Sequence, residues 1–260
     1  MKKFLGYILM VIFLPGCSSY ITNYYNYKQE QQTVTTRNYA LPYFDSIAVS
    51  GNMYVEIEKG VPTLSSAAQK QYNDKITAQV TKHTLYLTLP DYINQKNIAV
   101  LIKINNLKSL HAANHAYIIA NNLTSANLEI AADSHASINL QGMMSVNKII
   151  QKSDGKIEIN WIRSKKLEIE SYDHGLIMLA GKVKELTAKL RNNAQLDARY
   201  LRTKTADIFA TDIATAHIWV ADLLNAYTER RSNIYYYCIT KHRNIISKDH
   251  SNVLNVDWIQ

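Results

Sequence analysis

Apolar and polar residues alternate one by one along much of this chain. In 54–58, Val55 and Ile57 lie on one side of an extended backbone, and Tyr54, Glu56 and Glu58 lie on the other. Such alternation is typical of strands with one face in a core and the other in water. Strands are therefore predicted over residues 46–50, 53–58, 75–81, 84–89 and 98–104, and a short helix or irregular excursion over 64–72.

From Leu110 to the last residue, the alternation is organised into a repeat of about 20 residues. Each copy opens with an apolar residue, passes through a short polar turn and continues into a second alternating strand. The eight openings are Leu110, Leu128, Ile149, Leu167, Leu186, Ala206, Ala226 and Ile245. Stacked copies can pair each strand in parallel with its equivalents above and below. The predicted fold class is all-β: a parallel β-helix-like solenoid of about eight ~20-residue coils plus N-terminal strands.

The turn between the two strands of each copy is a polar triplet, such as Ser153-Asp154-Gly155 or Asp173-His174-Gly175. Its third residue is small in most copies, which suggests tight or left-handed backbone at that place. The residue types of the turns are therefore predicted to serve the backbone geometry in the first place, and ligand binding only in the second.

The first 17 residues have the pattern of a bacterial export signal. Two lysines precede an apolar run over 4–14, and Leu14-Pro15-Gly16-Cys17 resembles a lipobox, whose cysteine becomes the lipidated first residue of the mature protein. Ser18, rather than aspartate, follows Cys17, which favours the outer membrane, with the head facing the periplasm or the outside. An ordinary signal peptide with a chance cysteine is the alternative.

Three segments are predicted: residues 1–17 as a lipoprotein signal peptide, 18–40 as a flexible polar tether, and 41–260 as a single β-solenoid head. Cys17 and Cys238 are the only cysteines, so a lipidated Cys17 leaves no disulfide partner for Cys238. We expect Cys238 to be a buried, inert thiol. The formal charge of +8 falls by two when Lys2 and Lys3 are removed, and a basic envelope protein favours acidic glycan or lipid over nucleic acid as a partner.

The stretch from Phe44 to Gly60, followed by alternating strands and by Ser-Asp-Gly and Asp-His-Gly turns, carries a family resemblance. It resembles the putative auto-transporter adhesin head GIN domain over about residues 43–258, although many turn glycines are alanine or asparagine here. The resemblance implies a right-handed β-helix-like fold on an exported envelope protein. The resemblance implies no catalytic residues in this chain.

Cationic residues recur shortly before the openings and are the first candidate site. If they stack along one edge, like charges form a ridge that can follow an anionic polymer or lipid headgroups, such as lipopolysaccharide. A solvated ridge with no ligand is the alternative. The candidate residues are Lys108, Lys148, Lys165, Lys184, Lys204 and Arg243.

A second column follows the middle of the turn triplets, where His115, His135, Asp154 and His174 recur. Equivalent residues of neighbouring coils lie about 4.8 Å apart, close enough for two imidazoles to share a metal ion. Polar turns arise for structural reasons as well, so these residues are weak candidates and no metal or cofactor is predicted.

The function that this pattern favours is a non-catalytic envelope binding or adhesion module that recognises an anionic glycan, lipid or protein. A structural scaffold that self-associates through the ends of the solenoid is the second candidate, because the last coil has no evident cap. A glycan-active enzyme is the third, but the glutamates form no tight cluster in adjacent coils and no catalytic motif is present.

Overall fold

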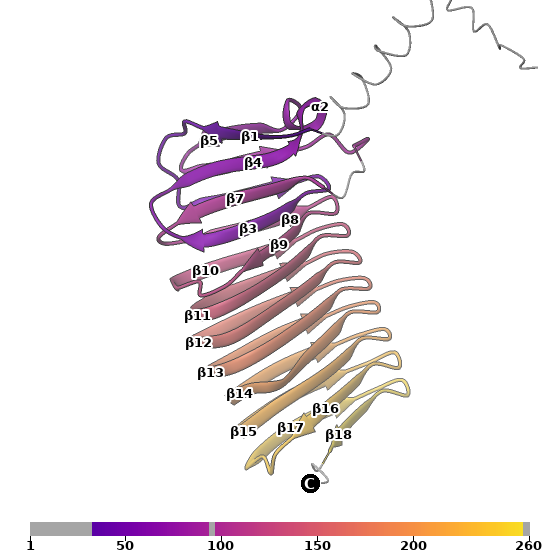
Figure 1. The fold of residues 1–260 in the computed structure, drawn as a ribbon. Coiled ribbons are helices and arrows are strands. Elements are labelled where there is room, and N and C mark those ends of the chain that lie inside the picture. Colours follow the sequence, from indigo (N-terminus) through magenta and orange to yellow (C-terminus); the bar gives the residue numbers. More distant parts are fainter. Residues whose placement is uncertain (1–32, 94–96, 257–260) are drawn as a thin grey trace, which may run out of the picture.

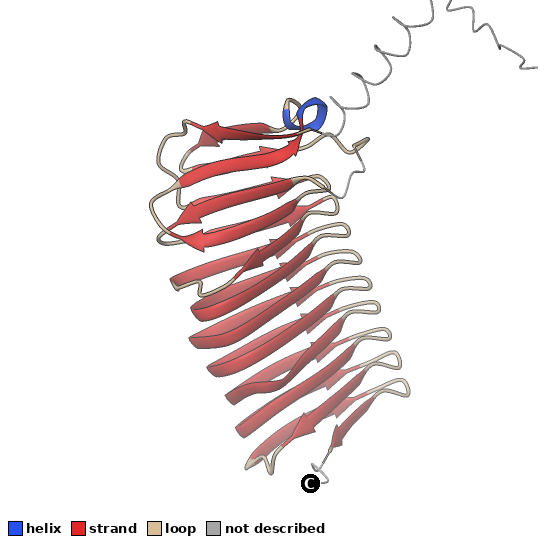
Figure 2. Ribbon diagram, viewed as in Figure 1, coloured by secondary structure: helices blue, strands red, loops and turns tan. Residues whose placement is uncertain are grey.

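The computed structural model describes residues 33–93 and 97–256, which form an elongated stack of strands (Figure 1). Strands dominate, and α2 is the one helix in the described part of the chain (Figure 2). The elements are β1 (Val34–Tyr39), β2 (Ser46–Ser50), β3 (Tyr54–Lys59), β4 (Thr63–Gln69), α2 (Lys70–Asn73), β5 (Thr77–Thr81), β6 (Thr84–Thr88), β7 (Ala99–Ile104), β8 (Ser109–Ala113), β9 (Tyr117–Ala120), β10 (Ser125–Ala132), β11 (Ser137–Gln151), β12 (Lys156–Ser171), β13 (Leu176–Leu190), β14 (Gln195–Ala210), β15 (Thr215–Thr228), β16 (Asn233–Tyr237), β17 (His242–Ser247) and β18 (Asn252–Asn255).

The repeat region is a β-solenoid of about seven coils of roughly 20 residues, as the sequence predicted. Each of the long strands β11 to β15 bends at a corner where the register of pairing shifts, so its two halves pair separately with the two halves of the neighbouring coil. Parallel pairing then stacks equivalent residues, and Ile138, Ile157 and Ile177 form one fully buried ladder of the core. Because each interior coil buries residues against the coils on both sides, the core is continuous along the stack.

The N-terminal strands close one end of the solenoid. β2 pairs in parallel with β6 and β8, and β3 with β7 and β9, while β4 runs antiparallel to both β1 and β7. Two expectations are corrected here. β1 belongs to the fold although the sequence placed it in the tether. β4 is a strand over most of 64–72, where a short helix or irregular excursion was expected, and helix α2 begins only at Lys70. β1 is mostly exposed, and β4 buries the small residues Ser66 and Ala68 beside Leu64, so neither strand has a strong apolar pattern.

The register of the coils also differs from the predicted one, by two residues in some copies. Two inward ladders lie side by side, and the openings proposed from the sequence mix them. The first contains Leu110, Ile130, Ile149, Ile169, Ala188, Ile208 and Ala226, and the second contains Leu167, Leu186, Ala206 and Leu224. A shift of two residues keeps every side chain on the same face of a strand, so alternation cannot detect it.

The turns confirm a left-handed backbone, but at the first residue of each triplet and not at the third. Ser134, Asp173 and Asp212 have φ values of 56°, 61° and 66°. Where the third residue is alanine, as at Ala136 and Ala214, it is fully buried under the turn, so it is small for lack of space.

The structure tests the prediction for Cys238 but not the one for Cys17. Cys238 is a free thiol, half-buried rather than fully buried as expected. Cys17, the signal segment 1–17 and residues 18–32 of the tether lie outside the described residues. No helix in the part of the chain that the structure describes is long and apolar enough to span a bilayer.

Candidate anion-binding surface

Six cationic side chains form two parallel columns at the corner where β12, β13 and β14 bend. Arg163, Lys182 and Arg202 are direct register partners in three consecutive coils. Two residues further along each strand, a lysine follows in the same three coils. We name this set the cation grid, and its members are Arg163, Lys165, Lys182, Lys184, Arg202 and Lys204.

The backbone forces all six side chains outward. Between the two columns lie Ser164, Val183 and Thr203, which are buried, so the residues on either side of them face solvent. The Ser164 hydroxyl donates to the carbonyl oxygen of Val146 at 2.8 Å and accepts from the N–H of Val146 at 2.9 Å. These bonds fix the corner that presents the columns.

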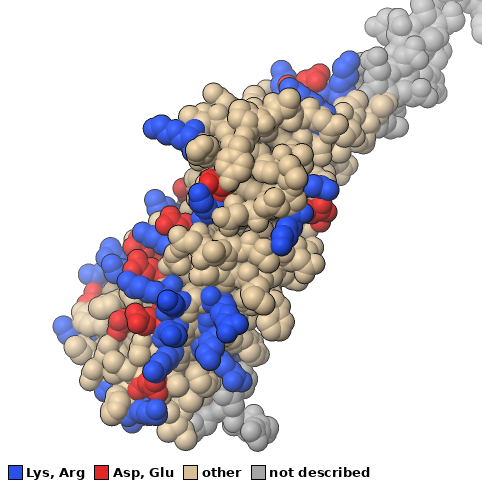
Figure 3. Space-filling view, turned by 90° about the vertical axis from the view of Figure 1, so that its left-hand side faces the viewer, with Lys and Arg blue, Asp and Glu red and all other residues tan. Residues whose placement is uncertain are grey.

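Stacking like charges at this spacing is unfavourable without an anion. Equivalent residues of neighbouring coils are about 4.8 Å apart, and two unit charges at that distance repel by about 1 kcal/mol in water. Within the described ranges, Lys204 is the grid member with a carboxylate partner, Asp222, at 3.6 Å. Asp222 is also shared with Lys241 at 2.8 Å, and mainly this lysine lowers the pKa of Asp222 from its ordinary value. Basic side chains gather over the C-terminal half of this face of the molecule (Figure 3).

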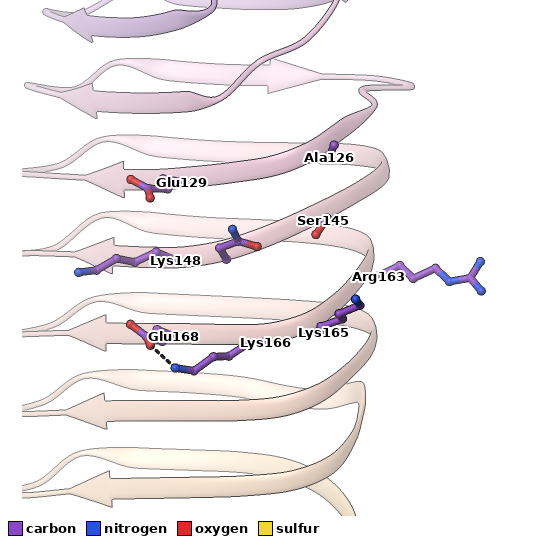
Figure 4. A pocket seen from close by; sticks show the side chains of 9 residues that line it. Ala126, Glu129, Ser145, Lys148, Arg163, Lys165, Lys166 and Glu168 are labelled. Atoms are coloured by element: carbon purple, nitrogen blue, oxygen red, sulfur yellow. Dashed lines mark ion pairs between the residues drawn. The ribbon is translucent and has the colours of Figure 1, made fainter.

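A hollow of about 600 Å³ lies against the upper edge of the grid (Figure 4). Arg163 and Lys165 line it together with Lys166, which pairs with Glu168 at 2.7 Å. Lys148 lies in register between Glu129 and Glu168, so the charges of this flank alternate. An anion is therefore better placed on the grid itself than on the side of the hollow where Lys148 lies.

The structure brings together three of the six residues of the predicted ridge, namely Lys165, Lys184 and Lys204. Lys108 forms an ion pair with Asp45 at 2.5 Å, which lowers the pKa of the Asp45 carboxyl. Lys148 lies between two glutamates, and Arg243 is in the last coil, where its guanidinium donates to the hydroxyl of Tyr236 at 3.0 Å.

The two-residue register shift explains why the predicted ridge wrongly included Arg243. Arg243 pairs with Leu224, whose equivalents in the coils above belong to the inward ladder, so it is not the equivalent of Lys204. Conversely, Arg163 was missed as a candidate. Its position two residues before Lys165, on the same face of an alternating strand, is the signal that could have found it.

The histidine column is assembled as the sequence indicated. The rings of His115 and His135 stack with centroids 4.8 Å apart and an angle of 5° between their planes. Asp154 then lies between His135 and His174, with its oxygens 3.4 and 3.3 Å from their ring nitrogens. No group of three or more His, Cys, Asp or Glu side chains in the described part of the chain is arranged to hold a metal ion.

Comparison with known proteins agrees with this architecture. The family model described as "Putative auto-transporter adhesin, head GIN domain" matches residues 43–239. The chain belongs to this family. No protein of curated function matches the sequence.

Solved structures of Parabacteroides proteins have the same fold as this head GIN domain. A protein described as a putative lipid binding protein from Parabacteroides distasonis is 16% identical with a TM-score of 0.78, and the match covers 86% of this chain and 97% of that one. A putative adhesin from Parabacteroides merdae is 19% identical with a TM-score of 0.77 and the same coverage of both chains. At these identities, the likeness concerns the fold alone.

Proposed function

We propose that this protein is a non-catalytic adhesion module of the cell envelope that binds an anionic glycan through the cation grid. The observation that carries the proposal is the stacking of six exposed cations in three consecutive coils, with one carboxylate partner for the set among the described residues. A polyanion that lies across the coils relieves the repulsion between the columns, and it releases counterions as it binds. Membership of an adhesin family supports a binding role.

We also propose that Cys17 is lipidated and that the lipid holds the head on the outer membrane. The sequence of the export signal supports this display. An anchored head with an exposed cationic face can meet glycans of the envelope or of another cell.

The test is the binding of heparin-type sulfated octasaccharides to the full chain, made unlipidated by Cys17→Ser, at several salt concentrations. The variant Lys165→Gln/Lys184→Gln/Lys204→Gln should bind more weakly, and its affinity should depend less on salt, with a log–log slope smaller by about two units. The matched control is Lys59→Gln/Lys75→Gln/Lys82→Gln, which removes the same charge from exposed lysines in β3, before β5 and in the turn between β5 and β6. Equal losses in both variants would leave only general attraction to a basic protein.

Anionic lipid is the competing ligand for the grid. Vesicles that contain phosphatidylglycerol or lipopolysaccharide are therefore tested with the same two variants. Binding of the vesicles, with no binding of the free octasaccharides, would assign the grid to lipid headgroups and contradict the glycan proposal.

Self-association through the C-terminal end is a second candidate function. β17 pairs with β15 alone and β18 with β16 alone among the described strands, and β17 is exposed throughout. Ile245 and Ile246 lie on β17 with exposed fractions of 42% and 54%. Analytical ultracentrifugation of the unlipidated chain tests this: Ile245→Lys should reduce a dimer if the end strands pair, and a concentration-independent monomer would exclude it.

A further inference from the structure

Two exposed aromatic side chains lie beside the cation grid, in coils that are separated by one other coil. Trp161 precedes Arg163 by two residues in β12, and Tyr200 precedes Arg202 by two residues in β14. Their exposed fractions are 71% and 64%, high for residues of this size. They therefore form a third outward column next to the two cationic ones.

The coil between them is shorter at this corner. Five residue steps separate Ile159 from Ser164 in β12, whereas four separate their partners Leu179 and Val183 in β13. Likewise, three steps separate Asp197 from Tyr200 in β14, whereas two separate their partners Met178 and Ala180. The short corner of β13 therefore presents Ala180 and Gly181 to the same hollow as the two aromatic side chains.

Small residues keep this short corner open. Ala180 is the register partner of Tyr200, and Gly181 follows it with a φ of +133°. A Cβ on Gly181 would lie 2.2 Å from the carbonyl oxygen of Ile162, so no larger residue fits there. The result is a hollow of about 450 Å³ with Trp161 and Tyr200 in its walls and Ala180 and Gly181 among its lining.

Trp161 holds a backbone conformation that its own burial does not explain. Its φ is +70°, in the left-handed region that bulky residues rarely adopt. The same corner of the coil above uses Gly142, with a φ of +140°. A strained, solvent-exposed tryptophan where a neighbouring coil has glycine points to a role in binding and not in folding.

The dimensions and the chemistry of the hollow suit a flat sugar ring. Two coil spacings separate the backbones of Trp161 and Tyr200 by about 9.6 Å. A ring held between two aromatic faces needs about 7 to 8 Å, since carbon contacts lie at 3.5 to 4.0 Å. Gln141 and Asn160 also line the hollow, and each amide supplies donors and an acceptor for hydroxyl groups.

We propose that this aromatic slot, made of Gln141, Asn160, Trp161, Ala180, Gly181 and Tyr200, binds one pyranose ring of a glycan. The C–H bonds of the ring lie against the negative π faces of Trp161 and Tyr200, and its hydroxyls reach the two amides. The inference deepens the proposed function and rests on it, because acidic substituents of the same glycan would then reach the adjacent cation grid.

The experiment separates the slot from the grid by comparing a charged glycan with its uncharged form. Hexamers of galacturonate, alginate and hyaluronan are screened by isothermal titration calorimetry against the full Cys17→Ser chain. The tightest binder is then used both as the acid and as its methyl ester, which keeps the rings and removes the charge. Trp161→Ala should weaken both forms by about tenfold, as expected for an aromatic contact at the centre of a site.

Three further variants define the origin of that loss. Trp161→Phe should keep most of the affinity, and Tyr200→Ala should lose it, since either ring alone stacks on one face only. Tyr86→Ala, which removes an exposed aromatic residue of β6, should change neither form. Melting followed by circular dichroism confirms that each variant is folded.

The outcomes distinguish the two proposals. Unchanged binding of both forms by Trp161→Ala overturns the slot, and a loss confined to the acid in the lysine triple variant still supports the grid. A loss of both forms in Trp161→Ala, with no effect of the triple variant, supports the slot and overturns the grid. If no hexamer binds, both the aromatic slot and the cation grid are overturned as glycan sites. If an aromatic peptide binds instead, and its binding depends on Trp161, the hollow is a protein-binding site and the sugar proposal is overturned.

Discussion

Gln151 lies beneath the turns that precede β12 and β13, and its surroundings allow a sharp test of side-chain packing between neighbouring coils. Gln151 is fully buried there, and its Nε2 donates to the carbonyl oxygens of Gly155 and Ser153 at 2.9 and 3.2 Å. The hydroxyl of Ser171 donates to Gln151 Oε1 at 3.0 Å. A Cβ on Gly175 would lie 1.3 Å from that Oε1, so Gly175→Ala must displace the buried amide.

The cost follows from the hydrogen bonds that the displaced amide loses. Each is worth about 1 kcal/mol net, and buried partners left unpaired cost more, so Gly175→Ala should lower the free energy of unfolding by about 3 kcal/mol. The backbone at Gly175 is not left-handed, so alanine itself is allowed there. The equivalent pair of positions two coils above has alanine at both places, Ala112 and Ala136, and both are fully buried.

The effect of Gly175→Ala on the free energy of unfolding should therefore differ when residue 151 is already alanine. In a Gln151→Ala background, the new methyl group enters the empty space, and Gly175→Ala should be neutral or stabilising by up to about 1 kcal/mol. Urea unfolding of the four proteins of the double-mutant cycle measures a coupling of about 3 kcal/mol. Equal effects in the two backgrounds, within about 0.5 kcal/mol, would refute the reasoning.

Three other predictions follow from particular residues. Trp161→Gly should raise the free energy of unfolding by up to about 1 kcal/mol while it abolishes sugar binding, since glycine relieves left-handed strain of about 1 to 2 kcal/mol and loses about 0.5 to 1 in backbone entropy; a clear destabilisation would make Trp161 structural. The pKa of His217 is lowered from 6.5 by burial and then by Arg199, so the unfolded chain binds more protons and stability should fall as pH drops below 6.5 through the lowered pKa. His217→Gln should flatten this dependence in urea titrations between pH 7 and 5, and an unchanged slope would assign it to other groups. Gly181→Ala should cost more than about 2 kcal/mol in thermal melts because of the clash and the positive φ, whereas Gly60→Ala, which meets only the flexible side chain of Lys103 at 3.3 Å, should cost less than about 1.

The sequence determined the class of fold but not the alignment of its coils. Alternation such as that of Ile157 and Ile159 shows which side chains face inward, and the repeat length shows that coils stack. Both signals are unchanged when a copy is shifted by two residues, which is how Arg243 was placed in the ridge. Pairing depends on hydrogen bonds between coils, and these carry no sequence signature of their own.

For the candidate sites too, the sequence revealed features that recur with the repeat but not those that depart from it. Lys165, Lys184 and Lys204 were found because they recur at the repeat spacing, and the histidines of the turns for the same reason. The aromatic slot was missed because it depends on a departure from the repeat: the corner at Ala180 and Gly181 is one residue short. A periodic pattern averages over such departures, and the strain at Trp161 becomes visible only in the backbone.

The short corner of β13 has a consequence for how these proteins can diverge. The coils return to common pairing within a few residues of it, because Val183 pairs with both Ser164 and Thr203. The loss or gain of one residue at a corner therefore reshapes the outer surface without moving the core ladders. The outer surface of a head GIN domain can then diverge through single-residue insertions and deletions at corners. Such changes are not tolerated in folds whose core packing depends on the length of every loop.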